Sequence, residues 1–517
     1  MRLFPIPLVQ RILRKYFNET RNDFYKMIAA VINEDTVGNI FKSLDGAREC
    51  DAIELRLDFL KAKDIENVRE NLADWKIKYG KIFIITIRKK GEGGFFNGSE
   101  EERLLLLKSF LGIADYIDIE FSSGKSTIKD FIKNKKSTKI IASFHDFEKT
   151  PNDIDGLYSQ IKKTRPDTIK IATKANSVID NFKILELIKK AKNYQEIIAF
   201  CMGSYGDFSR ILSIMFGSKL TYAALSKGRK VAEGQLTLSE MVCDFRARKI
   251  NDKTKISGLI GNPVLHSWSH VMHNSAFESL YINAVYLKFR VDKLEDFIRY
   301  FRKQNLLGFA VTIPHKTSVI DFLDEIDDAA RAIGAVNTIV NQKGRLIGHN
   351  TDCEGAMQAL GEKTELNGKK AVVLGAGGSA RAIAFGLKQN NAEVLILNRT
   401  LENAKAIADD LKCSYGKIGK LGKMDYDILI NTTPVGMHPK SNESPIPKKF
   451  IKKGSIVMDI VFNPFYTMLL KDAKSLGCIT IPGIEMLIKG NVMQSRLWTG
   501  KQVSESLMRK RVLEISH

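Results

Sequence analysis

Two lysines in this sequence have neighbours that could support chemistry on a ketone. The first, Lys170, lies in the apolar run TIKIAT, where burial disfavours a charged amine and so favours the neutral, nucleophilic form. Such an amine condenses with a ketone to an iminium, which acidifies the adjacent C–H bond. His145 ends the preceding apolar run, ASFHDF, and could move that proton. Either residue alone is more often structural, so the chemical interpretation depends on the two occurring together.

Polar residues that could complete this first site follow other apolar runs. Glu92, in RKKGEGG, could orient the imidazole of His145, and the glycines beside it would let the loop approach a ligand closely. Arg56, Arg88 and Arg210 offer the planar donor forks that bind a carboxylate. Each arginine alone could lie on the surface, but three at the ends of apolar runs indicate an anionic substrate.

The second lysine, Lys316, follows the apolar run in GFAVTIPHK, and Asp352 lies downstream in IGHNTDCEG. Reduction of a ketone needs a group that stabilises and protonates the developing alkoxide. An amine paired with a carboxylate meets that need, because the carboxylate positions the amine and the two can share the proton. Asn337, in AIGAVNTI, and Asn350 are further polar candidates. Singly, Lys316 and Asp352 would more often be surface and turn residues.

A glycine-rich segment, VVLGAGGSARA, follows a predicted strand and opens a predicted helix, so its backbone N–H groups can receive a pyrophosphate. Glycine-rich loops also serve ordinary turns, so this signal depends on its context. The next predicted strand, VLILNRT, ends in Arg399 and Thr400 instead of an acidic residue, which favours a 2′-phosphate and hence NADP(H) over NAD. The alternative is that Arg399 is a surface charge. The predicted cofactor-binding residues are Gly375, Ala376, Gly377, Gly378, Ser379, Ala380, Asn398, Arg399, Thr400 and Thr432.

Three histidines at helix-like spacing, His266, His270 and His273, raise the alternative of a metal site. No carboxylate or cysteine accompanies them as a further ligand, so no metal is predicted. Ser267 and Ser269, which lie among them, are better interpreted as donors to a substrate carboxylate.

The elements that must position the first site repeat eight times. Apolar, β-rich runs alternate with charged amphipathic stretches, and the runs cover residues 27–32, 52–59, 82–88, 116–121, 139–147, 168–173, 197–203 and 220–225. Eight such units predict a (β/α)₈ barrel, although an open doubly wound sheet has the same alternation. Barrel active sites lie at the carboxyl ends of the strands, and the candidates of the first site stand at those ends.

The predicted fold class is α/β, with the barrel over residues 27–249 and a polar linker at residues 249–255. An αβ substrate-binding domain is predicted over residues 256–355, with helices of residues 484–517 packing back on it. Residues 356–483 are predicted to form a Rossmann-type NADP-binding domain. Residues 1–26 are basic and amphipathic, and we expect either a floppy extension or translation that starts at Met27.

Composition is that of a soluble globular protein, and 517 residues exceed what one ordinary core holds, so at least two domains are expected. The net charge of +21 is spread over helix-like segments and mixed with acidic residues, which argues against nucleic-acid binding. No apolar run reaches the length of a membrane span. The six cysteines are scattered without a CxxC pair, which is typical of a reducing compartment, so a cytoplasmic location is expected.

The segments ELRLD, TIRKKGEGG, SFHDF, IKIAT, MGSYGDFSR and EGQL resemble, in order and spacing, the type I 3-dehydroquinate dehydratases over about residues 27–244. The resemblance implies that Lys170 forms a Schiff base with the C3 ketone of dehydroquinate. It implies that His145, paired with Glu92, removes the C2 proton and assists loss of the C1 hydroxyl. Many members carry a serine where this chain has Val231, in the lid loop before Gln235. The loop of this chain could therefore bind substrate less tightly or close differently. The implied substrate-binding residues are Glu54, Arg56, Arg88, Arg210 and Gln235.

From residue 256 onward the chain resembles the shikimate dehydrogenases, through GNPVLHSWS, GFAVTIPHK, AVNTI, GHNTD, GAGGSARA, NRT, NTTPVGM, DIVFNP and GIEML. The resemblance implies that Lys316 and Asp352 are catalytic in the NADPH-dependent reduction of the C5 ketone of 3-dehydroshikimate. Two positions depart from the family pattern: His270 replaces a usual proline, and Gly490 replaces a frequent glutamine. The implied substrate-binding residues are Ser267, Ser269, Thr312, Asn337 and Gln494.

The product of the first implied reaction is the substrate of the second, which favours a bifunctional shikimate-pathway enzyme that turns 3-dehydroquinate into shikimate. Two alternatives stay open. One domain could be active and the other degenerate, or the chain could be a non-catalytic sensor of shikimate or quinate. The expected partners are small molecules, without nucleic acid, membrane or an obligate protein partner.

Overall fold

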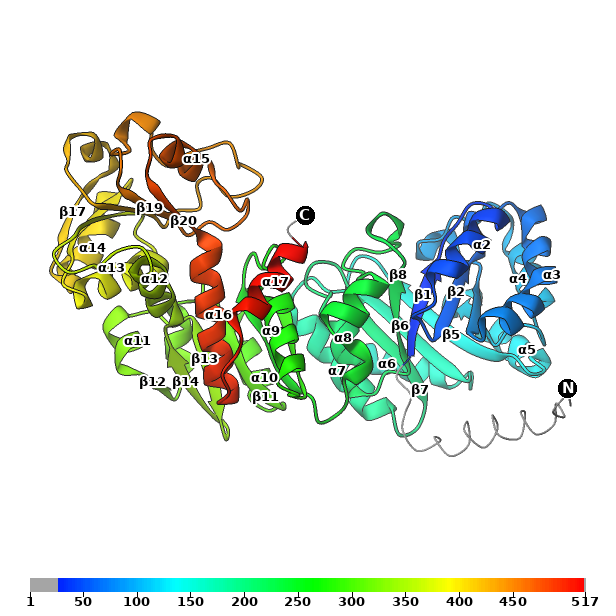
Figure 1. The fold of residues 1–517 in the computed structure, drawn as a ribbon. Coiled ribbons are helices and arrows are strands. Elements are labelled where there is room, and N and C mark those ends of the chain that lie inside the picture. Colours follow the sequence, from blue (N-terminus) through cyan, green and yellow to red (C-terminus); the bar gives the residue numbers. More distant parts are fainter. Residues whose placement is uncertain (1–26, 516–517) are drawn as a thin grey trace, which may run out of the picture. The chain divides into compact units, whose positions relative to one another are not determined.

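The computed structural model describes residues 27–515, and the chain divides into two compact units at Asp252 and Lys253. The first unit contains one sheet of eight strands, and the second contains two sheets of six strands each (Figure 1). The expectations for residues 1–26 lie outside the described residues, and so do residues 516–517.

The sheet of the first unit is parallel, with the strand order β7-β6-β5-β4-β3-β2-β1-β8. Strand β1 pairs with both β2 and β8, so the sheet curls and its two edge strands are β7 and β8. Between these edges the Lys219 N–H donates to the Ile197 carbonyl at 2.7 Å. All eight predicted runs form strands, so the predicted barrel is confirmed and the open-sheet alternative is wrong. The strands are β1 (Met27–Ile32), β2 (Ala52–Arg56), β3 (Ile82–Thr86), β4 (Tyr116–Glu120), β5 (Lys139–Asp146), β6 (Thr168–Lys174), β7 (Glu196–Met202) and β8 (Leu220–Ala224).

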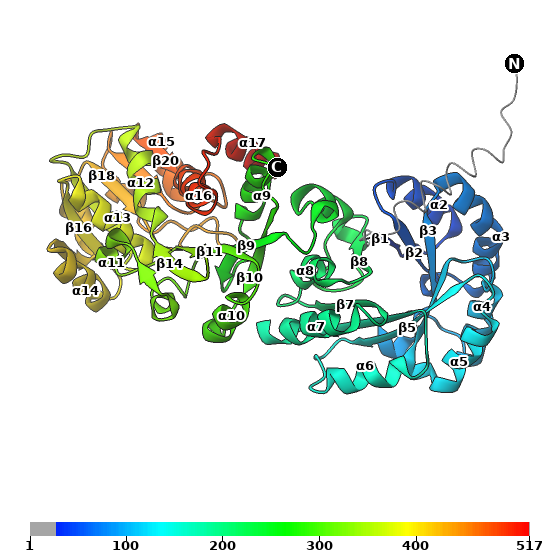
Figure 2. The same cartoon turned by 90° about the horizontal axis from the view of Figure 1, so that it is seen from below.

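Helices follow the barrel strands, and Figures 1 and 2 show them outside the ring of strands. Their ends carry the expected capping residues: Thr36 and Ser99 each accept a backbone N–H at a helix start, and Gly80 ends α3 in the left-handed conformation. The helices are α2 (Val37–Gly46), α3 (Ala62–Tyr79), α4 (Glu100–Ser109), α5 (Lys125–Asn134), α6 (Ile154–Lys162), α7 (Val178–Ala191) and α8 (Ser209–Phe216).

The interior of the barrel is partly apolar and partly polar. One part is an apolar cluster that includes Val31, Ile84, Ile141 and Ile198. Elsewhere the buried interior holds charged side chains, which a folded protein tolerates only when they are paired. These buried polar residues are Glu54, Arg56, Asp58, Arg88, Glu92, Asp118, Glu120, Ser143 and Lys170.

The second unit begins with a mixed sheet in the order β10-β9-β11-β13-β14-β12. Helix α9 packs on its first strands, and β13 and β14 form an antiparallel hairpin. The strands are β9 (Lys255–Gly261), β10 (Ala284–Arg290), β11 (Leu306–Val311), β12 (Glu325–Ile326), β13 (Thr338–Gln342) and β14 (Arg345–His349). The helices are α9 (Ser269–Ser279), α10 (Leu294–Phe301), α11 (Asp328–Ile333) and α12 (Thr351–Gly361).

The other sheet of this unit is parallel throughout, in the order β17-β16-β15-β18-β19-β20. The strand order reverses at β15, and such a reversal is where doubly wound sheets bind dinucleotides. The strands are β15 (Lys370–Leu374), β16 (Glu393–Asn398), β17 (Ser414–Lys417), β18 (Ile428–Asn431), β19 (Ile456–Asp459) and β20 (Ile479–Pro482). The helices are α13 (Gly378–Gln389), α14 (Leu401–Leu411) and α15 (Met468–Ser475).

Two C-terminal helices return to the first sheet of the second unit. Helix α16 (Gly483–Thr499) packs on α12 and donates the Trp498 indole N–H to the Ile339 carbonyl at 2.9 Å, and α17 (Glu505–Ile515) packs on α9. The α/β class and the Rossmann-type sheet are confirmed, whereas the exact division into domains stays a prediction.

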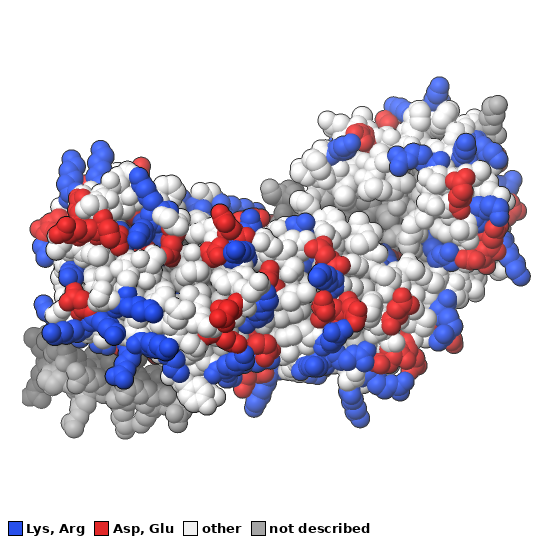
Figure 3. Space-filling model, turned by 180° about the vertical axis from the view of Figure 1, so that it is seen from behind, with Lys and Arg blue, Asp and Glu red and all other residues white. Residues whose placement is uncertain are grey.

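Basic residues outnumber acidic ones in this chain, and the two kinds are mixed on the surface. On the face drawn in Figure 3, Lys and Arg side chains are interspersed with Asp and Glu. No helix among residues 27–515 combines the length and the apolar character that crossing a membrane requires.

Candidate active sites

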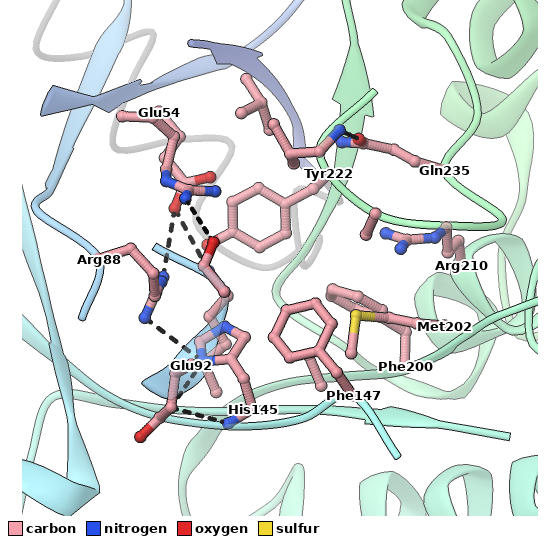
Figure 4. Close-up of a pocket in the computed structure, with 17 residues that line it drawn as sticks. Glu54, Arg88, Glu92, His145, Phe147, Phe200, Met202, Arg210, Tyr222 and Gln235 are labelled. Atoms are coloured by element: carbon pink, nitrogen blue, oxygen red, sulfur yellow. Dashed lines mark hydrogen bonds and ion pairs between the residues drawn. The ribbon is translucent and has the colours of Figure 1, made fainter. Parts of the chain in front are cut away.

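The first site is a pocket of about 450 Å³ at the carboxyl ends of the barrel strands. It brings together every residue that the sequence analysis assigned to this unit. Figure 4 shows Glu92 and His145 on one side of the pocket, Arg210 and Gln235 on the other, and Tyr222 between them. The predicted residues that line it are Glu54, Arg56, Arg88, Glu92, His145, Lys170, Arg210 and Gln235.

Lys170, on β6, is buried and lies between two carboxylates. Its Nζ is 2.9 Å from Asp118 Oδ2 on β4 and 3.3 Å from Glu54 Oε1 on β2. The amine also lies 4.1 Å from the ring centroid of Tyr222, a distance at which an ammonium group is attracted to the ring. The sequence analysis expected apolar surroundings, and that expectation is wrong, because acidic residues on other strands point into the same interior.

Glu92 contacts His145 as predicted. It lies in a short 3₁₀ turn (Lys90–Glu92), and its Oε2 is 3.1 Å from His145 Nδ1 and accepts the His145 backbone N–H at 3.0 Å. Its other oxygen accepts the Ser122 hydroxyl at 2.6 Å. Burial raises the pKa of Glu92 to about 7. Burial, together with the charges of Arg88 and Lys170, lowers the pKa of His145 well below its usual range, so the imidazole is neutral and can accept a proton.

The three arginines of the pocket differ in how far their guanidinium groups are already paired with protein acids. Arg56 pairs with Asp58 at 2.9 Å. Arg88 forms a bidentate pair with Asp118 at 3.0 Å and contacts Glu120. Arg210 stacks on a ring, and its Nε has no hydrogen-bond partner among residues 27–515. Burial lowers the pKa of Arg210 to about 10, which indicates a guanidinium that lacks full compensation by protein anions.

The loop before Gln235 also shapes this pocket. Val231 and Ala232 pack against the apolar cluster of the barrel, and the Val231 N–H donates to Gln235 Oε1 at 2.9 Å. This bond turns the amide NH₂ of Gln235 away from the loop backbone, so the amide keeps its donors available. Val231 therefore fills an apolar position, and its backbone fixes Gln235.

The second site lies in the second unit, where the two sheets meet. Lys316 follows a turn that is held by the His315 ring, whose Nε2–H donates to the Val291 carbonyl at 2.7 Å. The Lys316 amine contacts the Asp352 carboxylate, and the other Asp352 oxygen accepts Asn337 Nδ2–H at 2.8 Å. The predicted pair is thus in place, and Asn337 orients its carboxylate.

The Lys316 amine also donates to Ser379 Oγ at 3.1 Å. Ser379 lies in the first turn of α13, next to the glycine-rich loop. The group expected to protonate a substrate and the loop expected to hold a cofactor are therefore in direct contact.

The remaining candidates of the second site lie close to these residues. Ser267 Oγ accepts the Ser269 N–H at 3.2 Å, and Ser269 Oγ accepts Asn491 Nδ2–H at 3.2 Å. Gln494 donates to Thr338 at 3.0 Å, while its buried Oε1 has no partner among the described residues. Thr312 follows β11 and donates its backbone N–H to the Ile260 carbonyl.

The three histidines do not come together. The ring of His266 lies near His438 at 6.4 Å between centroids, and His270 donates Nδ1–H to the Ser267 carbonyl at 3.1 Å. His273 is buried against Ser495, with 2.8 Å between Nδ1 and Oγ. Among the described residues, no group of three or more metal-binding side chains is found.

The loop between β15 and α13 fits a dinucleotide. Gly375 has φ +111°, and a Cβ there would lie 2.6 Å from Thr432 Oγ1, whereas a Cβ at Gly377 would meet nothing within 4 Å. Helix α13 starts without a side-chain cap, so its first N–H groups face open space that a pyrophosphate could enter. Exposed Arg399 and Thr400 follow β16, where NAD-binding sheets carry an acid. This donor set fits NADP(H).

Sequence reasoning missed several residues that contact the predicted ones, among them Asp118, Tyr222 and Asn491. Asp118 alternates with Glu120 in the run YIDIE, and two acids on one face of a buried strand are a signal that could have been followed. Asn491 precedes Gln494 by three residues, which places both on one helix face. Nothing local distinguishes Tyr222.

Comparison with known proteins finds relatives of both units. Family models match residues 28–252 (type I 3-dehydroquinase), 259–339 (shikimate dehydrogenase substrate binding domain) and 356–454 (shikimate / quinate 5-dehydrogenase). A shikimate dehydrogenase (NADP(+)) of Caldanaerobacter subterraneus is 44% identical and covers 49% of this chain and 94% of its own. A solved shikimate dehydrogenase in complex with NADP+ is 38% identical, with a TM-score of 0.50 over 52% of this chain and 98% of its own.

One relative spans both units. The bifunctional 3-dehydroquinate dehydratase/shikimate dehydrogenase of Arabidopsis thaliana, a chloroplastic protein, is 36% identical over 507 residues, 93% of this chain and 83% of the relative. The resemblance noted in the sequence thus extends over 93% of this chain and includes both units. This protein therefore belongs to the family of bifunctional 3-dehydroquinate dehydratase/shikimate dehydrogenases.

Proposed function

We propose that the first unit dehydrates 3-dehydroquinate to 3-dehydroshikimate and that the second unit reduces this product to shikimate with NADPH. One observation carries the proposal: the two lysines each stand beside the partner that their chemistry requires. Lys170 shares a pocket with the neutral base His145, and Lys316 contacts Asp352 beside the nucleotide loop. This supports two active units over the alternative of one degenerate domain.

In the first unit, Lys170 attacks the C3 carbonyl and forms an iminium with loss of water. Neutral His145 then takes the C2 proton, and Glu92 stabilises the resulting imidazolium across 3.1 Å. The same imidazolium returns a proton to the departing C1 hydroxyl. Water then hydrolyses the product iminium, which breaks the C–N bond and releases 3-dehydroshikimate and the Lys170 amine. Arg210 and the amide of Gln235 bind the substrate carboxylate, because both face the pocket with donors to spare. Glu54, Arg56 and Arg88 line the opposite wall and face the ring hydroxyls.

In the second unit, Ser267 and Ser269 hold the substrate carboxylate at the start of α9. Thr312, Asn337 and Gln494 contact the ring hydroxyls. Lys316 donates a proton to the C5 oxygen as it becomes an alkoxide, and Asp352 keeps the amine directed toward that oxygen.

NADPH supplies the hydride when it is bound. The residues that would hold it come from three loops of the parallel sheet. Residues Gly375 to Ala380 would hold the pyrophosphate, Asn398, Arg399 and Thr400 the 2′-phosphorylated ribose, and Thr432 the segment after β18. No membrane or nucleic-acid partner is proposed, and the cytoplasmic location stays a prediction.

The test supplies 3-dehydroquinate and NADPH to the full chain and follows oxidation of NADPH. Steady oxidation is expected in the wild type. Lys170→Ala should abolish it with 3-dehydroquinate but leave oxidation with 3-dehydroshikimate intact, and Lys316→Ala should abolish both. Binding of either ligand without any turnover would instead support the sensor, and turnover of 3-dehydroshikimate alone would show a degenerate first unit.

A further inference from the structure

The carboxylate of Asp118 has no part in the steps above, yet it contacts the atom that would react. It is fully buried in the middle of β4, beneath the pocket. Its Oδ2 lies 2.9 Å from Lys170 Nζ, closer than Glu54 Oε1 at 3.3 Å. No other carboxylate oxygen of the described residues lies nearer to this amine.

Asp118 is held through both of its carboxylate oxygens, whereas Glu54 accepts the Thr86 hydroxyl and the Lys170 amine at Oε1. Both oxygens of Asp118 accept from Arg88, at 3.0 Å each, and Oδ1 also accepts the Ser143 hydroxyl at 2.5 Å. Burial would raise the pKa of Asp118, but the charges of Arg88 and Lys170 outweigh it and hold the pKa well below its usual range. The carboxylate is therefore ionised at neutral pH, and its two bonds to Arg88 keep it facing Lys170. Glu54, by contrast, lines the pocket and is available to a substrate.

The charges around Lys170 balance only while its nitrogen is positive. The groups that face the amine come from four strands and one loop: Glu54, Asp118, the Tyr222 ring, neutral His145 and Arg88. Two cations thus meet two anions in a buried space. A neutral nitrogen would leave one buried carboxylate uncompensated, which is costly in a low-dielectric interior.

Schiff-base formation preserves this charge. When the Lys170 ammonium and a ketone condense, the C–N bond forms and the C–O bond breaks. Two of the three nitrogen-bound protons leave with the carbonyl oxygen as water, and one stays on the iminium. The positive charge therefore remains at the same place, and only the protonated iminium withdraws electrons strongly enough to acidify the C2 proton.

We propose that Asp118 is the counter-ion of the Schiff base and keeps the iminium nitrogen protonated. This inference rests on the proposed dehydratase function of the first unit. Without the carboxylate, the iminium loses its proton at lower pH, and the neutral imine no longer serves as an electron sink. A nearby opposite charge shifts such a proton equilibrium by about one to three pH units.

The experiment traps the Schiff base on the full chain without NADPH. Wild type, Asp118→Asn and Glu120→Gln are mixed with 3-dehydroshikimate and cyanoborohydride between about pH 5 and pH 9, and the reduced adduct is counted by intact mass. Cyanoborohydride reduces an iminium much faster than a neutral imine. Glu120→Gln is the matched control, because Glu120 is buried on the same strand and contacts Arg88 and Arg103 but not Lys170.

We expect the pH at which trapping is half lost to fall by one to three units in Asp118→Asn and to stay unchanged in Glu120→Gln. Identical trapping curves for wild type and Asp118→Asn would overturn the inference, and so would an equal shift in Glu120→Gln. Absence of trapping in the wild type would overturn the proposed dehydratase function itself. If Asp118→Asn does not fold, the trapping curve of the wild type alone still tests the counter-ion role. Its trapping must persist to a pH at least one unit above that of an unpaired model ketimine, and loss at the same pH would refute the counter-ion role.

Discussion

Replacement of Glu92 by glutamine should remove the pH dependence of the dehydratase reaction near neutrality. Burial raises the pKa of Glu92 to about 7, so the carboxylate in the resting pocket is half protonated at that pH. Only the ionised form can stabilise the imidazolium that His145 becomes when it takes the C2 proton. The wild-type rate should therefore rise with pH, because Glu92 loses its proton as pH passes through about 7.

The magnitude follows from the contact between the two side chains. Glu92 Oε2 lies 3.1 Å from His145 Nδ1, and a glutamine oxygen can occupy the same place without the charge. Hydrogen bonds to charged groups stabilise by about 1.5–3 kcal/mol and neutral ones by about 0.5–1.5 kcal/mol, so the loss is about 1–2 kcal/mol. In rate, this corresponds to about a 5- to 30-fold decrease above pH 7.

The assay measures kcat for 3-dehydroquinate dehydration from about pH 5 to pH 9 in wild type and Glu92→Gln. Shikimate dehydrogenase activity of the same samples is the internal control, because it depends on Lys316 and Asp352 in the other unit. A Glu92→Gln profile that still rises with a midpoint near pH 7 would show that another group titrates there. An undiminished rate above pH 7 would show that the Glu92 charge has no part in the proton transfer.

Three further predictions concern single contacts. Arg210→Ala should raise KM for 3-dehydroquinate about 30-fold or more, since it removes the guanidinium left incompletely paired in the pocket, while KM for 3-dehydroshikimate should not change. Arg399→Ala should weaken NADP+ binding, measured by titration calorimetry, about 10-fold and leave NAD+ binding unaltered; equal losses would place Arg399 away from the 2′-phosphate. Gly490→Ala should stabilise the second unit by about 0.5–1 kcal/mol in thermal unfolding, because its Cβ would meet only Thr351 at 3.6 Å. Gly355→Ala should destabilise it, because that Cβ would lie 3.0 Å from the backbone of α16, and the reverse order would refute this account of the helix crossing.

The departures from the family pattern have local consequences that the structure defines. His270 is half-buried and donates to the Ser267 carbonyl, so it fixes the turn that a proline would otherwise stiffen. At Gly490 there is room for a larger side chain, so packing does not require the glycine. Neither departure displaces Lys316 or Asp352 from their contact.

The sequence by itself determined the fold class, the two units and the residues that could react. Apolar runs with amphipathic stretches between them are local features, and burial of their apolar faces determines an α/β class, while closure of the first sheet into a barrel was decided by the tertiary structure. The glycines after β15 and the arginine after β16 are likewise local, because a turn and a strand end need only a few consecutive residues. Lys170, His145 and Lys316 could be named for the same reason.

Only the tertiary structure decided which charges meet. Asp118 and Lys170 lie on β4 and β6, and their contact depends on strand register and on barrel closure, which no short segment encodes. Assembly of the strands also pairs Arg88 with Asp118 and leaves Arg210 incompletely paired, whereas Arg56 pairs locally with Asp58. The raised pKa of Glu92 also follows from burial among residues distant in sequence. Electrostatic interactions in a protein interior depend on distance and solvent exclusion, and both exist only after the strands have assembled.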